Sequence, residues 1–275
     1  MGMKIAAGWY KKGLGGALGF LVGALVLGTA FPHLLNSIGA SFDWQNVIVS
    51  VSVLSALGGL LMLILVPDGP YLYKGTKFNP KAILIIFRSK ELRSAAFGYF
   101  GHMWELYTLW AFIPILLAAY KLGGQGGINI SFWSFIIIAA GGIGCALGGI
   151  IAKRTGSLPV AFYQLLASGI CCVLSPLIFS LPLEIYLGFF IFWGIVVAGD
   201  SPQFSALVAT SAPHEYVGSA LTIVNSIGFF ITIISIQFTN YLVGFISTKY
   251  LMVFLVIGPI FGLISIWKSF RLNKR

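Results

Sequence analysis

Eight long apolar segments limit what this chain of 275 residues can fold into. A helix needs about 20 apolar residues to cross the hydrocarbon core of a bilayer, and each segment reaches that length. Each segment is predominantly apolar without a regular alternation, whereas the strands of a membrane barrel alternate apolar and polar residues. We therefore predict an all-α fold, a polytopic transmembrane helix bundle with eight spans. The predicted spans are Gly13–Ile38, Trp44–Val66, Ala95–Tyr120, Ile130–Ala152, Leu158–Phe179, Leu183–Ala212, Val217–Ile246 and Tyr250–Phe270.

The composition agrees with a membrane protein and excludes a soluble one. Hydrophobic residues make up 58% of the chain and charged residues 9%, against about 25% charged residues in soluble domains. The mean hydropathy is +0.96. A net charge of +10 would suggest nucleic acid as a partner of a soluble protein. In this chain the positive charges gather on one side of the predicted spans, which is typical of a membrane protein. We therefore expect a lipid bilayer and no nucleic acid as the partner.

Lysine and arginine residues predict the orientation of the chain in the membrane. Fifteen of the 17 lie before the first span, between the second and third, after the fourth, or at and after the end of the eighth, and only Lys121 and Lys249 lie on the other side. Cytoplasmic loops are enriched in these residues. We predict a multi-pass protein of the cytoplasmic (inner) membrane with both termini in the cytoplasm. The first apolar run is too long for a cleavable signal peptide, so none is expected.

The longest polar stretch separates two predicted spans from six. Residues 1–67 hold the first two spans, residues 68–94 form a basic cytoplasmic loop, and residues 95–275 hold a six-helix bundle. The loop could carry short helices on an anionic inner leaflet, where each Lys or Arg contributes about 1 kcal/mol. Alternatively, the loop only determines the topology.

Two acidic residues, Glu105 and Asp200, lie deep inside predicted spans. His102 and Glu105 are three residues apart and share one helical face. Asp200 precedes Pro202, which cannot donate a helical hydrogen bond. At 1.5 Å per residue, Glu105 and Asp200 lie about 15 and 18 Å from the inner ends of their spans, so both acids could line one cavity. The polar neighbours of Asp200, which offer partners to the freed backbone groups, are Ser201, Gln203 and Ser205.

An ionisable residue in the middle of a membrane helix costs about 2.5–3.5 kcal/mol on insertion scales, so it is a functional candidate by default. Burial makes a carboxyl group easier to protonate, and a histidine can relay a proton near neutral pH. Glu105 or Asp200 could therefore carry a proton, with His102 tuning or relaying it. The alternative is that the polar residues only tie helices together.

The seventh span carries a polar stripe at helical spacing, which predicts a face turned toward protein or water. Thr222 and Asn225 belong to it, and Asn225 is our candidate for hydrogen bonding a substrate, although a role in joining helices is equally consistent. Tyr107 is a candidate for an aromatic wall of the same pathway. The fifth and eighth spans carry few polar residues, and we expect them to face lipid. The stripe positions are 222, 225, 229, 232, 236 and 239.

Small residues recur at four-residue spacing in two spans, where they allow helices to approach closely. The first span holds Gly15, Gly19 and Gly23, and the fourth holds Ala140, Gly144 and Gly148. No Gly-Lys-Ser/Thr sequence follows the glycines, which excludes a phosphate-binding loop. The three cysteines lie in apolar runs without the spacing of a metal site, so we predict packing roles, no metal and no cofactor.

The sequence resembles the Major Facilitator Superfamily, and in particular bacterial permeases of unknown substrate. The resemblance rests on three stretches, Gly98 to Tyr107, Ala198 to Ser205 and Val217 to Thr222. A fourth stretch resembles the gating loop of the family, Gly-x-x-x-Asp-Arg-x-Gly, and Lys153 stands at its Asp position. The residues that correspond to this gating loop are Gly149, Lys153, Arg154 and Gly156.

The resemblance implies twelve helices, whereas the sequence has eight. Residues 13–66 would correspond to family helices five and six, residues 68–94 to the central loop, and residues from Ala95 onward to the C-terminal half. The first four helices would then be absent, through truncation or because a partner chain supplies them.

The leading prediction is a secondary active transporter that moves a small solute by alternating access, with protons as a candidate coupling ion. The alternative is a truncated, non-transporting assembly module that needs a partner for the missing helices. A membrane-embedded enzyme is disfavoured because His102 and Glu105 lack the second histidine of a His-Glu-x-x-His site. A channel is disfavoured because the sequence shows no repeated ring of charge.

Overall fold

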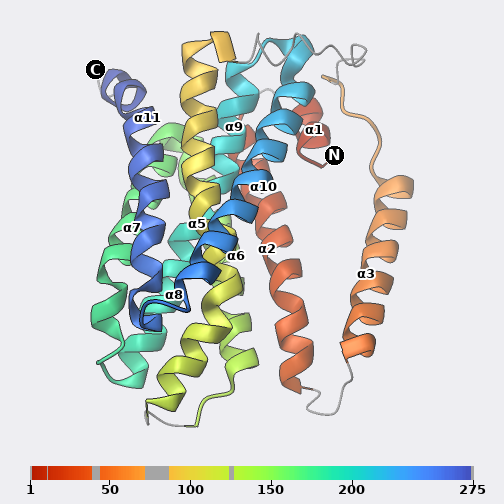
Figure 1. Ribbon diagram of the computed structural model, residues 1–275. Helices are drawn as coiled ribbons and strands as arrows, with labels where there is room; N and C mark the ends of the chain where they lie inside the picture. Colours follow the sequence, from red (N-terminus) through yellow and green to blue (C-terminus); the bar gives the residue numbers. More distant parts are fainter. Residues whose placement is uncertain (1, 11, 39–43, 72–86, 124–126, 274–275) are drawn as a thin grey trace.

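The computed structural model describes residues 2–10, 12–38, 44–71, 87–123 and 127–273. Within these ranges the chain is helical, and eight helices are long and apolar enough to cross a membrane, which confirms the predicted fold class and number of spans (Figure 1). The elements are α1 (Gly2–Trp9), α2 (Leu14–Ile38), α3 (Trp44–Leu65), α5 (Lys90–Leu122), α6 (Ile130–Thr155), α7 (Ser157–Ile178), α8 (Leu183–Gly199), α9 (Ser201–Ser211), η1 (His214–Tyr216), α10 (Val217–Leu242), η2 (Thr248–Val256) and α11 (Ile257–Asn273).

Helix α5 is the central element of the bundle. It packs against α9, α10, α11 and η2, and most of its residues are buried. Its 33 residues span about 50 Å, well beyond the roughly 30 Å of hydrocarbon. The helix begins at Lys90, five residues before the predicted start at Ala95, because Ser89 caps it: the Leu92 amide donates to Ser89 Oγ over 3.3 Å.

The sixth predicted span is interrupted at its buried acid. Helix α8 ends at Gly199 and α9 begins at Ser201, with Asp200 between them. Pro202 stands in the first turn of α9, and the amides of Gln203 and Phe204 both donate to the Asp200 carbonyl. The predicted loosening of the helix at Pro202 is therefore confirmed, and it places Asp200 at a junction deep inside the bundle.

Two faces of α6 carry small residues, and each allows a neighbouring helix to approach closely. A Cβ atom on Gly19 of α2 would lie 2.6 Å from the Cys145 carbonyl oxygen, so only a glycine fits there. On another face of α6, a Cβ atom on Gly144 would overlap with the carbonyl of Ile195 in α8. The predicted close approach is confirmed, and it involves two neighbours of α6. Gly19 of α2 meets Cys145 and Gly149 on one face, and Gly144 meets α8 on the other.

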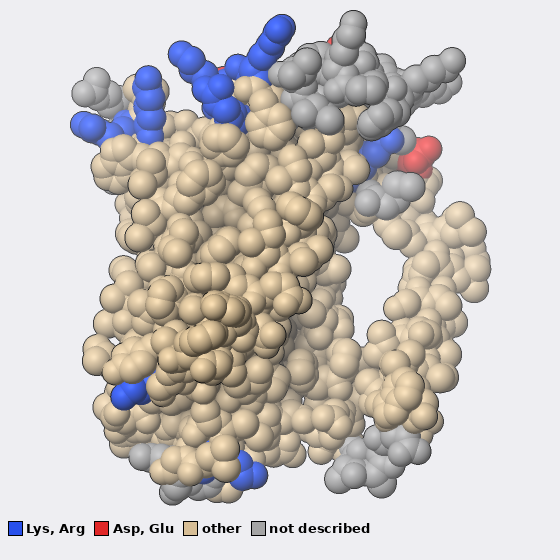
Figure 2. Space-filling view, in the orientation of Figure 1, with Lys and Arg blue, Asp and Glu red and all other residues tan. Residues whose placement is uncertain are grey.

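Helix α3 stands apart from the bundle. None of its residues is buried, and it makes few contacts with α2. In the space-filling view an open gap separates it from the rest of the molecule (Figure 2).

Helix α7 corrects the expectation that the fifth span faces lipid throughout. One of its faces exposes Leu166, Ile170 and Val173, as expected, but the opposite face is buried and includes Ser168 and Cys172. The eighth span likewise buries Leu251, Met252 and Leu255, because it packs against α7 and α5. It begins as the 3-10 helix η2 instead of as an α-helix.

Basic side chains gather at one end of the bundle (Figure 2). We call this the basic end; it holds the first turn of α5, the last turn of α6 and the last turn of α11. Lys121 and Lys249 lie at the opposite end, at the close of α5 and the start of η2. The distribution agrees with the pattern used to predict orientation, which itself stays a prediction. Most of the basic loop, residues 72–86, lies outside the described residues.

Candidate functional site

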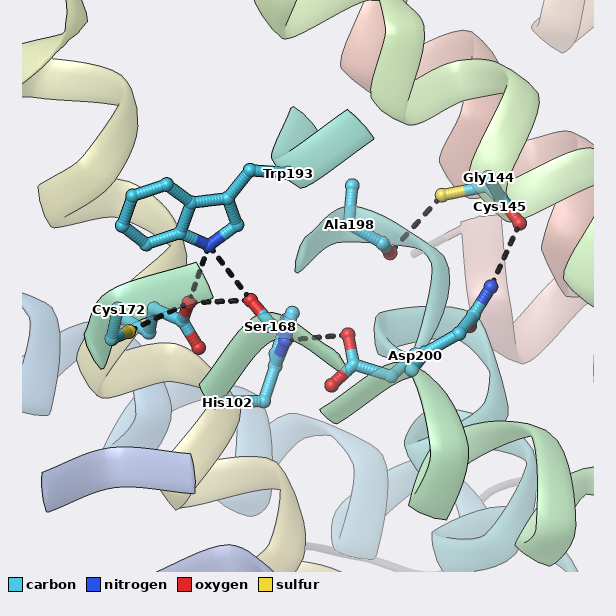
Figure 3. A network of polar contacts seen from close by, with 10 residues as sticks. His102, Gly144, Cys145, Ser168, Cys172, Trp193, Ala198 and Asp200 are labelled. Atoms are coloured by element: carbon cyan, nitrogen blue, oxygen red, sulfur yellow. Dashed lines mark hydrogen bonds and ion pairs between the residues drawn. The ribbon is translucent and has the colours of Figure 1, made fainter. Parts of the chain in front are cut away.

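A buried ion pair joins α5 to the break between α8 and α9. His102 Nδ1 lies 2.8 Å from Asp200 Oδ1, and both residues are inaccessible to solvent, with exposed fractions of 1% and 0% (Figure 3). The helix break explains this position, because Asp200 follows the last residue of α8 and its side chain projects from the junction toward α5. The structure thus brings together two of the residues that the sequence predicted for the site.

A second buried cluster is centred on Glu105, one turn further along α5. Trp193 Nε1 donates to Glu105 Oε1 over 2.8 Å, and Cys172 Sγ lies 3.3 Å from the same oxygen. Ser168 Oγ also donates to Glu105 Oε1, and it lies 3.0 Å from Trp193 Nε1 (Figure 3). Glu105 is fully buried, so α5, α7 and α8 meet at one carboxyl oxygen.

The two clusters form adjacent layers of one polar region, because residues three apart on a helix are neighbours on its surface. Several atoms in this region have no hydrogen-bond partner among the described residues, although buried polar atoms are normally paired. These atoms are Glu105 Oε2, Asp200 Oδ2, His102 Nε2, Gln203 Oε1 and Ser205 Oγ. Such atoms weaken a bundle, so they indicate a polar region that serves something other than stability.

A family comparison decides the class of protein. The model of the Major Facilitator Superfamily matches residues 1–236. The chain belongs to the Major Facilitator Superfamily. No curated protein sequence matches it. The superfamily consists of membrane transporters, so the polar region lies in a protein of the transporter class, as the sequence resemblance implied.

Gln203 is buried inside the bundle, but it makes a different contact from the one expected. The sequence suggested that it satisfies backbone groups freed by Pro202. Instead, its Nε2 donates to the Gly15 carbonyl of α2 over 3.3 Å, across 188 positions of sequence. Gln203 therefore joins α9 to α2, and its Oε1 has no partner in the described part of the chain.

The predicted polar stripe of α10 faces protein in only part of its length. Thr222 is exposed, and its hydroxyl donates to the Gly218 carbonyl of its own helix over 2.9 Å. The fully buried positions of α10 include Val224, Gly228 and Ser235. The structure therefore does not bring Thr222 to the buried clusters. Further along the stripe Thr232 and Thr239 are buried, so only the second half of the stripe faces protein as predicted.

Asn225 and Tyr107 lie half-buried outside the two clusters. Asn225 Nδ2 lies 3.7 Å from the sulfur of Met3. The Tyr107 ring packs against Phe229 at 5.4 Å and against Trp110 at 5.2 Å between centroids. Tyr107 therefore helps to seal α5 against α10, and the described contacts do not bring it to Glu105.

The predicted gating residues surround the end of α6 that lies at the basic end. Gly149 packs against Gly16 of α2, and the Lys153 side chain also lies along Gly16. Arg154 is exposed. Gly156 alone links α6 to α7, and its φ of +84° is a backbone conformation that favours glycine. The gating role of these residues stays a prediction.

Sequence reasoning missed Ser168, Cys172 and Trp193. Each is an ordinary residue of an apolar span, and only packing decides which face of α7 or α8 meets α5. One signal was available: Ser168 and Cys172 are four residues apart and therefore share a face of their helix. A face with two polar donors in an apolar span indicates a buried polar partner.

The polar region is closed to solvent in this structure. The buried oxygen atoms of Glu105 and Asp200 have no measurable solvent-accessible surface. A shared cavity between the two acids therefore stays a prediction, for a different conformation of the protein. A crevice too narrow for water lies between α5, α9 and α10; its lining residues are Tyr99, Ser205, Val208, Leu221, Val224 and Asn225.

Proposed function

We propose that the chain acts as a secondary active transporter that moves a small solute across the cytoplasmic membrane by alternating access, coupled to protons. Two bundles of a transporter open in turn to each side of the membrane around a site near the midplane. In this proposal the occluded polar region of Glu105, His102 and Asp200 is that site. The basic end faces the cytoplasm, because basic residues are retained on that side.

The arrangement around Glu105 is the observation that supports the proposal most strongly. All the hydrogen bonds that the described residues give to its carboxyl group go to Oε1, whereas Oε2 has none. A neutral carboxyl group is much easier to bury in an apolar interior than a charged one. Proton binding at Oε2 would therefore neutralise Glu105 in the occluded state without disturbing the donors on Oε1. Opening the site to water would allow the proton to leave.

The His102–Asp200 pair would provide the second charge of the coupling mechanism. The pair is held at the break between α8 and α9, where the backbone is already interrupted. Movement at this junction would separate Asp200 from His102 and expose both to water. A substrate with a hydrogen-bond donor could then bind the carboxylate. Gly156, the single-residue link between α6 and α7, would act as a hinge at the basic end, and Lys153 and Arg154 would contact the neighbouring helices as it moves.

Transport assays with purified protein test this proposal. We would reconstitute the chain in liposomes and apply a panel of labelled sugars, amino acids, carboxylates and organic cations, with and without an imposed pH gradient. The proposal predicts that at least one solute accumulates only with the gradient, and that Glu105→Gln and Asp200→Asn each reduce this accumulation tenfold or more. Normal accumulation in both variants would contradict the coupling mechanism.

Helix α3 favours a second candidate, an assembly module that needs a partner. All residues of α3 are at least partly exposed, and an open gap lies between this helix and the bundle (Figure 2). Apolar helices in lipid are normally held by packing against other helices. A partner chain that supplies further transmembrane helices would fill this gap. Stable co-purification with such helices, together with no transport by the chain alone, would support the module.

A further inference from the structure

The short helix α1 lies at the basic end, at the side of the bundle (Figure 1). It contacts α2 and α10. The Met3 side chain of α1 packs against buried apolar residues in both parts of the hydrophobic core. The methylene groups of Lys4 lie beside Gly218, at the first turn of α10. Helix α1 is therefore wedged between two membrane-spanning helices that begin at this end.

Met3 contacts one of the residues that line the narrow crevice between α5, α9 and α10. Asn225 lines this crevice, and its Nδ2 lies 3.7 Å from Met3 Sδ. At the inner end the Tyr99 ring lies 5.8 Å from the His102 ring. Ser205, which lines the crevice between them, is buried and its hydroxyl has no partner among the described residues. The crevice is thus lined both by Asn225, which contacts α1, and by Tyr99, whose ring lies beside His102.

The contact between Asn225 and Met3 is poor for the amide. A side-chain amide offers two donors and two acceptor lone pairs, and a thioether sulfur is a weak acceptor. Asn225 is half-buried, so the contact keeps a polar group away from water without satisfying it. Water or a polar solute would satisfy it better once Met3 moves away. The closed arrangement is therefore one that the protein can leave.

The other end of α1 is fastened to the segment that follows α3. Trp9 Nε1 donates to the Pro67 carbonyl over 3.1 Å, and the Tyr71 amide donates to the Gly8 carbonyl over 2.8 Å. Gly69 lies so close to Gly8 that a Cβ atom there would overlap with the Gly8 carbonyl group. A movement of residues 67–71 would therefore pull directly on α1.

We propose that α1 is a plug that closes the route from the basic end to the buried polar region, and that residues 67–71 form the tether that holds it in place. This inference rests on the proposed function, because it makes the crevice the route by which solute or protons reach the site. Release of Met3 from Asn225 opens the crevice to Ser205, and a movement of residues 67–71 would be transmitted to the plug.

Thiol labelling tests the plug without any knowledge of the solute. We would place a cysteine at the inner wall of the crevice (Ser205→Cys) and measure its reaction with a hydrophilic maleimide in lipid nanodiscs, where both faces of the protein are accessible. The three native cysteines are buried, and the chain without the new cysteine provides the blank. A cysteine at the exposed Glu215, at the same end of the bundle, provides the control (Glu215→Cys).

The plug predicts slow labelling of Ser205→Cys and an increase of tenfold or more when Met3→Asp is added. Trp9→Phe, which removes the hydrogen bond to Pro67 and reduces the size of the ring system, should give a smaller increase, and it provides the same test if Met3→Asp does not fold. The rate at Glu215→Cys should not change. Equal rates at Ser205→Cys with and without both changes would overturn the plug. Faster labelling without transport of any solute would keep the plug and reject the proposed function.

Discussion

Trp193 and Glu105 are joined by a buried hydrogen bond of 2.8 Å between the indole N–H and Oε1. The same N–H lies 3.0 Å from Ser168 Oγ, so the indole holds both the acid and another of its donors. The bond fixes the rotation of the carboxyl group, and this rotation leaves Oε2 without a partner among the described residues. The proposed role of Glu105 depends on this asymmetry between its two oxygens.

We predict that Trp193→Phe destabilises the protein and weakens proton coupling. The change keeps most of the ring but removes a donor to a fully buried carboxyl group, at a cost of about 1–2 kcal/mol. Thermal unfolding in detergent should show a loss of several degrees. With Oε1 less strongly held, the pH profile of uptake should also move relative to wild type.

Trp110 provides the matched control for this prediction. It is buried on α5, and its Nε1 has no hydrogen-bond partner in the described residues. Trp110→Phe removes the same N–H group without breaking a bond, so it should cost clearly less stability and leave the pH profile unchanged. Equal effects of the two substitutions would mean that the bond between Trp193 and Glu105 has no special role.

A double-mutant cycle on His102 and Asp200 should show strong coupling between them. Removal of one partner from a buried ion pair leaves an unpaired polar group and typically costs about 3–5 kcal/mol. We predict a cost of this order for His102→Gln and for Asp200→Asn, and a cost for the double variant well below the sum of the two. Additive losses in thermal unfolding would show that the 2.8 Å contact contributes no coupling energy.

Glycine substitutions test the packing of α2 against α6. Gly19→Ala would place a Cβ atom 2.6 Å from the Cys145 carbonyl oxygen, and overpacking of this kind costs about 1–3 kcal/mol. Gly28 lies in the same helix with nothing within 4 Å of its Cβ position. Gly28→Ala should therefore be neutral or stabilising by up to about 1 kcal/mol. A similar fall in melting temperature for both variants would be inconsistent with the described helix contact.

The sequence was sufficient to predict the spans and the buried acids. Span length depends on the bilayer thickness, so eight apolar segments could be counted directly. Pro202, two residues after Asp200, predicted a loosened helix at the point where α8 gives way to α9, because proline lacks an amide hydrogen. Both features depend only on local chemistry.

The contacts between helices could not be predicted in the same way. The rotation of α10 depends on how it packs against α5, which is why Thr222 proved to be exposed. The partners of Glu105 lie 63 and 88 positions away, on faces of α7 and α8 that the sequence does not distinguish. Helix α1 was not predicted, because eight residues are too few to form a stable helix without tertiary contacts.

Solute-induced proton movement through Glu105 is the most direct test of the central claim. Wild type and Glu105→Gln would be compared in liposomes that contain a pH-sensitive dye, with a solute identified by the transport panel. We predict that solute addition moves protons with wild type only, while exchange of labelled for unlabelled solute continues in the variant. Glutamine keeps the shape of the side chain but cannot gain or lose a proton at physiological pH. Proton movement of the same size in Glu105→Gln would contradict the assignment of Glu105 as the proton carrier.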